Sequence, residues 1–194
     1  MDSPYSQLYI FDFEKKKIYP TVISTAVNYL KKINIDFEKP NKDSDKEIYK
    51  KSQSDLLNTD PLLCLRCRVS KAIYFECKDI YENNRDKVDL FDLSRIVLID
   101  DGKKFLRIRN NKGDLRRYLI NFSFLEKNEI KIKLPIFLEI IRTFNYERSN
   151  LNTWTKRLVK GNSEIKNYMS QVGIKFIKKW AKIADTSTKR IKNS

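Results

Sequence analysis

The sequence predicts a mainly α-helical protein with a small β-hairpin, arranged as a helical bundle with basic helices at its C-terminal end. Apolar residues recur at the helical spacing of three and four through most of the 194-residue chain. One segment instead places two short apolar runs around an Asn-Asn-Lys-Gly turn, which is the pattern of a hairpin. We divide the chain into a small N-terminal segment with a linker (1–43), a helical and hairpin domain (44–133) and a basic helical region (134–194).

The N-terminal segment is predicted to contain a strand and a helix. Residues 8–13 are aromatic and β-branched, which favours a strand, and residues 21–33 carry apolar side chains at helical spacing. A charged, proline-containing linker follows at 38–46. We expect Ser44 or Asp45, at the end of this linker, to cap the next helix.

The middle of the chain is predicted to contain two helices, a buried segment and the hairpin. Residues 62–81 have apolar side chains at helical spacing and predict a pair of helices. Residues 90–99 form a buried segment. The hairpin consists of residues 104–109 and 115–123, joined by the turn at 110–113.

The C-terminal region begins with two helices joined by a polar turn. Pro135 suits the position at which a helix over 136–144 begins, because its φ is already fixed near the helical value. The turn spans 145–150, and Gly161 is predicted to end the second helix as its C′ residue. The apolar face of this second helix is predicted to consist of Leu151, Trp154, Leu158 and Val159.

Three further segments complete the prediction. Asn162 or Ser163 can cap a short helix that ends near Gly173. Residues 174–184 form an amphipathic segment. Residues 187–191 are either the second helix of a helix-turn-helix, cut short at the end of the chain, or a frayed basic tail.

Positive charge is concentrated in the last quarter of the chain. The whole sequence has 40 Lys and Arg against 25 Asp and Glu, a net charge of +15, and residues 148–194 hold twelve of the basic residues but only two acidic ones. Such a surface attracts a phosphate backbone, and its binding should weaken steeply as salt releases counterions. A solvated lysine-rich surface is the alternative, but a uniform compositional bias would not leave the first 147 residues nearly balanced.

Residues 144–159 carry a resemblance to a known family. The stretch Phe-Asn-Tyr-Glu-Arg-Ser-Asn-Leu-Asn-Thr-Trp at 144–154, followed by Arg-Leu-Val at 157–159, resembles region two of bacterial sigma factors of the extracytoplasmic-function type. It is similar in particular to sigma-factor-like regulatory proteins of cyanobacteria, and weaker similarity runs from about residue 60 to the C-terminus. The sequence departs from the family pattern at Asn145 and Tyr146, where Asp-Pro is usual, and at Asn150, where Gly is usual.

The resemblance implies a sigma-like, DNA-binding transcription regulator whose partners are DNA and core RNA polymerase. The helix at 136–144 would pack against polymerase or support the helical hairpin. Aromatic residues would stack on bases and cations would fix phosphates, although a place in the core is the alternative for Trp154. The candidate nucleic-acid-binding residues are Tyr146, Arg148, Trp154, Lys156, Arg157, Lys160, Lys175, Lys178, Lys179, Lys189 and Arg190. A nucleic-acid-binding protein unrelated to polymerase is the second interpretation.

Neither a membrane protein nor a common type of enzyme is expected. No apolar run approaches the roughly 18 residues that span a bilayer, and the N-terminus lacks the order of a signal peptide, so we expect a cytoplasmic protein. The chain has no histidine, which removes the commonest general base and metal ligand. We therefore expect no cofactor and no metal. Cys64, Cys67 and Cys77 cannot complete a four-ligand zinc site and should pack as small apolar residues.

One enzymatic alternative remains, a divalent-metal nuclease. Asp60 and Glu76 would hold the metal ion, and Lys78 would stabilise developing negative charge or help to activate water. This arrangement requires residues 72–78 to form a strand, which would place Glu76 and Lys78 on the same side.

Overall fold

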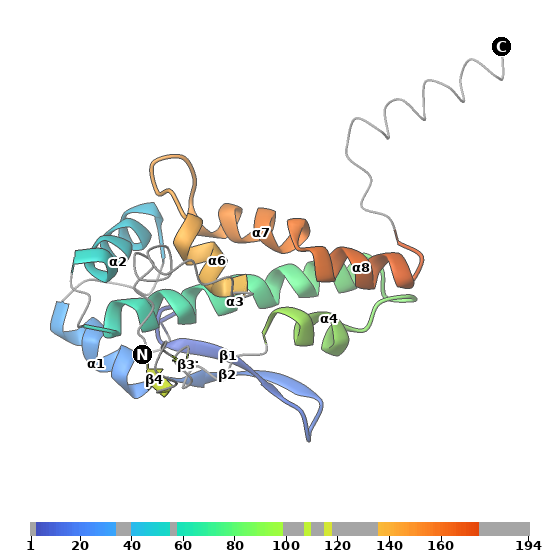
Figure 1. The fold of residues 1–194 in the computed structure, drawn as a ribbon, viewed down its shortest axis with the longest axis horizontal. Coiled ribbons are helices and arrows are strands. Elements are labelled where there is room, and N and C mark those ends of the chain that lie inside the picture. The colour runs from blue at the N-terminus through green and yellow to red at the C-terminus, as the bar shows by residue number, and fades with distance from the viewer. Residues whose placement is uncertain are drawn as a thin grey trace, which may run out of the picture.

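The computed structural model confirms a mainly helical fold. It describes residues 3–33, 40–54, 58–98, 107–109, 115–117 and 136–174. Within these ranges there are seven helices and two antiparallel hairpins (Figure 1). The helices are α1 (Ser24–Ile33), α2 (Lys42–Ser54), α3 (Asp60–Glu82), α4 (Leu90–Val97), α6 (Ile136–Thr143), α7 (Leu151–Gly161) and α8 (Ser163–Gln171), and the strands are β1 (Gln7–Asp12), β2 (Lys17–Val22), β3 (Arg107–Arg109) and β4 (Leu115–Arg117).

Strands β1 and β2 pair antiparallel from Gln7 opposite Val22 to Asp12 opposite Lys17. The predicted strand at 8–13 is therefore confirmed. Its partner was missed, because residues from 21 onward were assigned to a helix, whereas α1 begins at Ser24. Pro20 is tolerated in β2 because this sheet has only two strands, so each strand has an outer edge that needs no ladder hydrogen bond.

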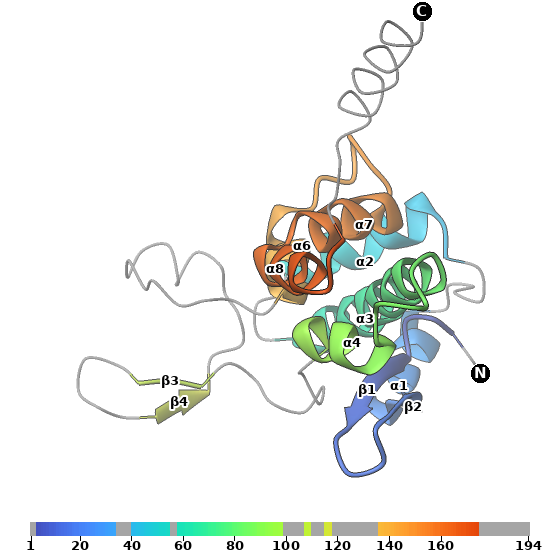
Figure 2. The same cartoon turned by 90° about the vertical axis from the view of Figure 1, so that its right-hand side faces the viewer.

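Helix α3 is the central element of the fold. The prediction of two helices over 62–81 is wrong, since one helix of 23 residues runs from Asp60 to Glu82. Pro61 lies at its start, and no glycine or proline follows to interrupt it. It contacts β1, α1, α2, α4, α6 and α7. In Figures 1 and 2, α7 and α8 lie on one side of α3 and the β1–β2 hairpin lies on the opposite side.

Helix α2 begins earlier than predicted. Neither Ser44 nor Asp45 caps it, because both lie inside the helix and both are buried. The side-chain oxygen of Asn41 accepts the backbone N–H of Ser44 at 2.8 Å, so Asn41 occupies the capping position. Because the helix begins at Lys42, Asp45 lies within it and is buried.

The C-terminal helices follow the prediction closely. Helices α6 and α7 are joined by the polar turn at 145–150, and α8 ends at Gln171, two residues before Gly173, whose φ of 76° suits glycine. Gly161 does not act as a C′ residue, because it is the last residue of α7 and Asn162 after it is extended. The Asn162 side chain instead accepts the backbone N–H groups of Glu164 and Ile165 and so caps α8. Pro135 and residues 175–194 lie outside the described residues.

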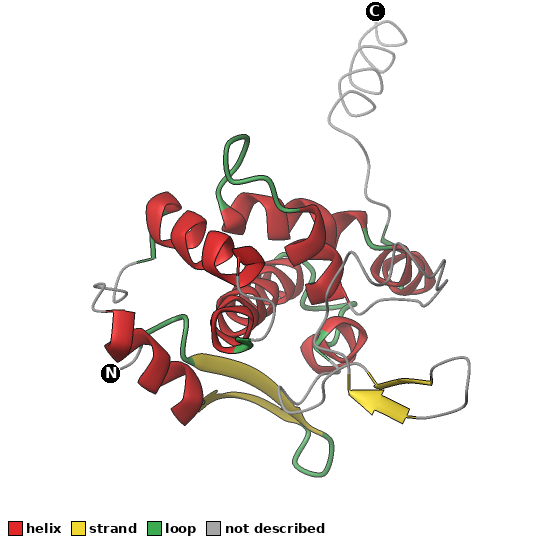
Figure 3. Cartoon of the chain, turned by 60° about the vertical axis from the view of Figure 1, so that its left-hand side comes forward, coloured by secondary structure: helices red, strands yellow, loops and turns green. Residues whose placement is uncertain are grey.

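The predicted hairpin and buried segment are also present. Strands β3 and β4 pair antiparallel, with Arg107 opposite Arg117. The predicted turn at 110–113 and the rest of the two predicted strands lie outside the described residues. The segment predicted as buried over 90–99 contains α4, capped by Asp89, with Leu93 and Val97 buried. The predominance of helix is clear in Figure 3.

The described elements pack around one continuous hydrophobic core, to which all seven helices contribute. Its largest fully buried side chains include Leu65, Ile73, Ile140 and Leu151. None of the helices in the described ranges is both long and apolar enough to cross a bilayer. The division at residues 43 and 133 stays a prediction.

Candidate nucleic-acid interface

Helix α7 presents a basic face to solvent, as its sequence predicted. The side chain of Asn150 caps it by accepting the backbone N–H of Thr153 at 2.8 Å. Leu151 and Val159 are fully buried, and Trp154 and Leu158 are partly buried against the core. The exposed residues of the helix include Lys156, Arg157 and Lys160.

Two of these lysines are committed to a carboxylate of the core. Lys160 Nζ lies 2.9 Å from Oε1 of Glu76, and Lys156 Nζ lies 3.5 Å from Oε2. Glu76 on α3 is completely buried, whereas about half of each lysine side chain is exposed. These contacts are ion pairs by distance, and neither meets the geometry of a hydrogen bond. A buried carboxylate requires such cations, so part of the charge on α7 stabilises the fold.

Trp154 is also engaged within the protein. Its Nε1–H donates to Oγ1 of Thr143 at the end of α6, at 3.1 Å. The guanidinium carbon of Arg157 lies 4.8 Å from the centroid of the indole ring, a cation–π distance. The side chain is only partly buried, so it lies at the edge of the core with Arg157 beside it.

Tyr146 lies over helix α2. Its ring is partly buried and its centroid is 6.0 Å from that of Tyr49. Lys46 and Lys50 place their Nζ atoms 5.4 and 5.6 Å from the Tyr146 ring. The two α2 lysines therefore add positive charge beside the turn at 145–150, which the sequence did not predict.

Two adjoining pockets open between α3, the start of α2 and the start of α7. Their volumes are about 500 and 420 Å³, and they share Pro40, Arg68 and Asn152. We call the residues that line the two pockets together the basic groove. Its charged lining residues are five cations, Lys42, Arg68, Lys71, Arg148 and Lys156, and one carboxylate, Asp45.

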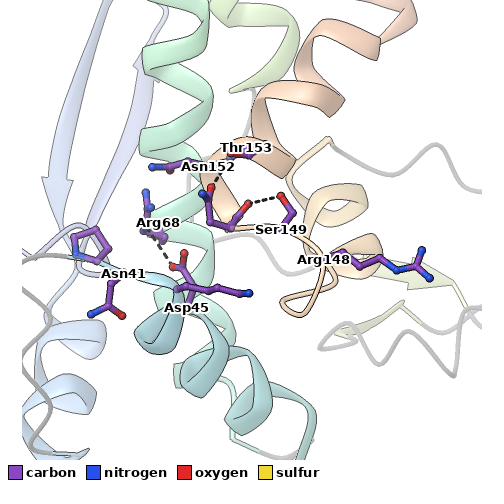
Figure 4. A pocket seen from close by; sticks show the side chains of 10 residues that line it. Asn41, Asp45, Arg68, Arg148, Ser149, Asn152 and Thr153 are labelled. Atoms are coloured by element: carbon purple, nitrogen blue, oxygen red, sulfur yellow. Dashed lines mark hydrogen bonds and ion pairs between the residues drawn. The ribbon is translucent and has the colours of Figure 1, made fainter.

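A buried polar network holds the floor of the basic groove in place. The hydroxyl of Tyr5 donates to Oδ1 of Asp45 at 2.6 Å, and Nε of Arg68 lies 3.4 Å from the same oxygen. Figure 4 shows Asp45 of α2 and Arg68 of α3 pointing toward one another beside the start of α7. Burial raises the pKa of Asp45, although Arg68, Tyr5 and the backbone N–H of Leu151 all favour its charged form. Burial and the neighbouring Asp45 also raise the pKa of Tyr5 far above its usual value.

The basic groove includes two of the predicted binding residues. Arg148, which extends outward from the turn before α7 (Figure 4), lines the larger pocket, and Lys156 lines the smaller one. Tyr146, Trp154, Arg157 and Lys160 do not line either pocket. The remaining candidates, Lys175, Lys178, Lys179, Lys189 and Arg190, lie outside the described residues.

Sequence reasoning missed the contribution of α3. Arg68, Lys71 and Phe75 stand three, four and seven residues apart on one helix, so they share a face. That spacing was visible in the sequence, but the division of 62–81 into two helices obscured it. The approach of Pro40 and Lys42 to the same face could not be seen, because it depends on how α2 packs on α3.

The arrangement required by the nuclease alternative is not formed. Residues 72–78 are helical, and Asp60 and Glu76 are sixteen residues apart on α3, which separates them by about 24 Å along the helix axis. Lys78 pairs with Glu82 at 3.7 Å. Within the described ranges, no three His, Cys, Asp or Glu side chains gather as metal ligands.

The three cysteines are buried and free of disulfides. Burial raises the pKa of the Cys67 and Cys77 thiols to about 12 and raises that of Cys64 as well. Because the thiolate is the reactive form, these side chains behave as small apolar residues at neutral pH.

Comparison of the chain with protein-family models, with curated proteins and with solved structures found no match.

Proposed function

We propose that this protein binds nucleic acid through the basic groove and acts as a DNA-binding transcription regulator. The observation that carries the proposal is the composition of the groove, in which five cations accompany one carboxylate. That carboxylate, Asp45, is already paired with Arg68. Lys156 is likewise paired with Glu76, so the net positive charge of the groove, which suits a phosphate backbone, comes from Lys42, Lys71 and Arg148.

The placement of the cations supports the same conclusion. Lys42 and Arg148 are exposed at the pocket beside the start of α7, and Lys71 and Lys156 flank the second pocket. Lys42 donates to the backbone carbonyl of Glu147 at 3.4 Å, a contact that leaves its charge in place. Cations spread over both pockets can contact successive phosphates, which position a nucleic acid without reading its sequence.

The finer proposal, that the nucleic acid is promoter DNA and that core RNA polymerase is a partner, rests on the resemblance of residues 144–159. The apolar face of α6 is buried against the core of the protein itself, with Ile140 and Ile141 almost inaccessible. Helix α6 therefore supports the helical hairpin, and a polymerase contact would use other surfaces.

A binding titration with a matched charge control tests the general proposal. The groove variant Lys42→Gln/Lys71→Gln/Arg148→Gln removes three positive charges from the pockets. The control variant Lys17→Gln/Lys32→Gln/Lys166→Gln removes three from exposed positions on β2, α1 and α8. With a labelled DNA at about 50 mM salt, we expect the groove variant to bind at least about tenfold more weakly than the control variant. Equal affinities would contradict the proposal.

A pull-down against bacterial core RNA polymerase tests the finer proposal. Stoichiometric capture of polymerase together with promoter-length DNA is expected of a sigma-like regulator. DNA binding without polymerase capture would leave a nucleic-acid-binding protein unrelated to polymerase.

A further inference from the structure

We infer that the basic groove holds one nucleotide, with its base against Phe75 and its phosphate on the cations around Arg68. The inference deepens the proposed function, because it assigns separate parts of the groove to base and phosphate. It also goes beyond that function, since either a free nucleotide or one unit of a strand has this chemistry.

The base site is the pocket of about 420 Å³. Its apolar lining consists of Pro4, Pro40, Ala72 and Phe75. The Phe75 side chain is unusual among the large apolar residues of the described chain, because 48% of it is exposed. Its ring makes edge contacts with the ring of Tyr74, at a centroid distance of 5.5 Å, and with that of Tyr9, at 6.2 Å. A supported and half-exposed ring is a suitable stacking surface for a base.

The other aromatic candidates are less suitable. The indole N–H of Trp154 is bonded to Thr143, and Arg157 lies against its ring. Tyr146 packs over α2 near Lys46 and Lys50. Neither ring lines a pocket of the basic groove, whereas Phe75 does.

The phosphate site is centred on Arg68. This residue is only 5% exposed, yet it lines both pockets. Its ion pair with Asp45 uses Nε, and a guanidinium has further N–H donors that suit a phosphate. Because Asp45 is fixed in turn by Tyr5, the cation is held in position before any ligand binds. Lys71 and Lys156 line the smaller pocket with it, and Lys42 and Arg148 line the larger one.

The dimensions of the groove agree with such a ligand. The two volumes, about 420 and 500 Å³, lie within the range of roughly 300–1,000 Å³ that is usual for ligand pockets. One pocket offers an aromatic wall and the other is lined mainly by polar and charged residues, and they meet at Arg68. A base joined to a phosphate has the same division into an apolar and an anionic part.

Titrations of the full chain with adenosine 5′-monophosphate and with a labelled single-stranded oligonucleotide test the inference. The variant Phe75→Leu keeps an apolar side chain and removes the ring. The control Phe13→Leu makes the same change at a residue that is 60% exposed in the turn between β1 and β2, away from the groove. We expect Phe75→Leu to weaken binding at least about fivefold, the loss of one base–aromatic stack, and Phe75→Trp to restore it.

The readouts separate stacking from a general loss of structure. Phe75→Leu removes no charge, so the salt dependence of strand binding should keep its slope while the affinity falls. Binding of the monophosphate that depends on Phe75 identifies a free nucleotide as the ligand. Dependence seen with the strand alone identifies one unit of a chain, and both outcomes support the inference.

Two results would overturn it, and the titration with labelled DNA shows separately whether the proposed function fails. If Phe75→Leu binds both probes as the unaltered protein does, the nucleotide site is wrong even though the groove binds nucleic acid. If neither probe binds the unaltered protein, the nucleotide site is wrong as well. If the monophosphate binds through Phe75 while no nucleic acid binds, the nucleotide site stands and the proposed function fails.

Discussion

The Nζ atom of Lys160 lies 2.9 Å from Oε1 of Glu76, a carboxylate with no exposure to solvent. With Lys156 at 3.5 Å from the other oxygen, this contact joins α7 to the C-terminal half of α3. The two lysines therefore have a structural task in addition to any contact with phosphate. Substitution of either lysine would change folding and binding together. The groove variant therefore leaves both lysines in place.

We expect the double substitution Lys156→Met/Lys160→Met to lower the free energy of unfolding by about 3 kcal/mol. It keeps the apolar stems of both side chains but leaves Glu76 buried without a cation, which is costly. Urea denaturation measures the change. Lys166→Met, on the exposed face of α8, is the control and should change stability by less than about 0.5 kcal/mol. Equal stability of the two variants would show that the ion pairs contribute nothing.

The N-cap of α7 gives a second prediction. Asn150→Ala removes the bond to the backbone N–H of Thr153 and should cost about 1 kcal/mol of stability. Asn152→Ala makes the same chemical change two residues later, at an exposed position inside the helix, and should be neutral or slightly stabilising. The melting temperatures of both variants, from thermal unfolding, measure the difference. A lower melting temperature for Asn152→Ala than for Asn150→Ala would be the wrong order.

The buried hydroxyl of Tyr5 gives a third prediction. Tyr5→Phe removes a hydrogen bond of 2.6 Å to the Asp45 carboxylate and should destabilise the protein by about 1.5–3 kcal/mol, as expected for a bond to a charged group. Tyr19→Phe, on the exposed face of β2, serves as the control and should stay within about 0.5 kcal/mol. Denaturant titrations of both proteins provide the comparison. A Tyr5→Phe protein as stable as the control would mean that Asp45 does not depend on this bond.

The thiols give a prediction about pH. The pKa of Cys67 and of Cys77 rises to about 12 on folding, so folding favours their protonated forms. The corresponding stability is complete below the ordinary thiol pKa of about 8.5 and is lost as pH rises from there toward 12. At pH 8 we expect Ellman's reagent to react with the native thiols at least about 100-fold more slowly than with the urea-unfolded chain. Comparable rates in the two states would contradict the burial of these cysteines.

Local sequence patterns were sufficient to predict the C-terminal helices. Apolar residues at 136–144, the polar turn at 145–150 and the cap at Asn162 each act over a few residues, and the structure follows them. The basic face of α7 was predictable for the same reason. Strand β2 was not, because Pro20 and an exposed outer edge do not produce the pattern of a buried strand.

The candidate site depended on packing and was only partly predictable. Arg148 and Lys156 were identified from their own sequence surroundings, but Arg68 and Lys42 reach the basic groove through the contact of α2 with α3. The sequence around Glu76 suggested a metal ligand. Nothing near it in the sequence indicates that two lysines about 80 residues later would approach its carboxylate. Long-range pairing of charges is decided by the fold and leaves no periodic trace in the sequence.

The dependence of DNA affinity on salt tests the central claim most directly. Each phosphate contact contributes about 0.7–0.9 to the slope of log affinity against log salt concentration. If Lys42, Lys71 and Arg148 contact phosphates, the groove variant should have a slope shallower by about 2–3 than that of the unaltered protein. The control variant Lys17→Gln/Lys32→Gln/Lys166→Gln should keep the original slope. Equal slopes for the groove variant and the unaltered protein would show that the basic groove is not where this chain meets nucleic acid.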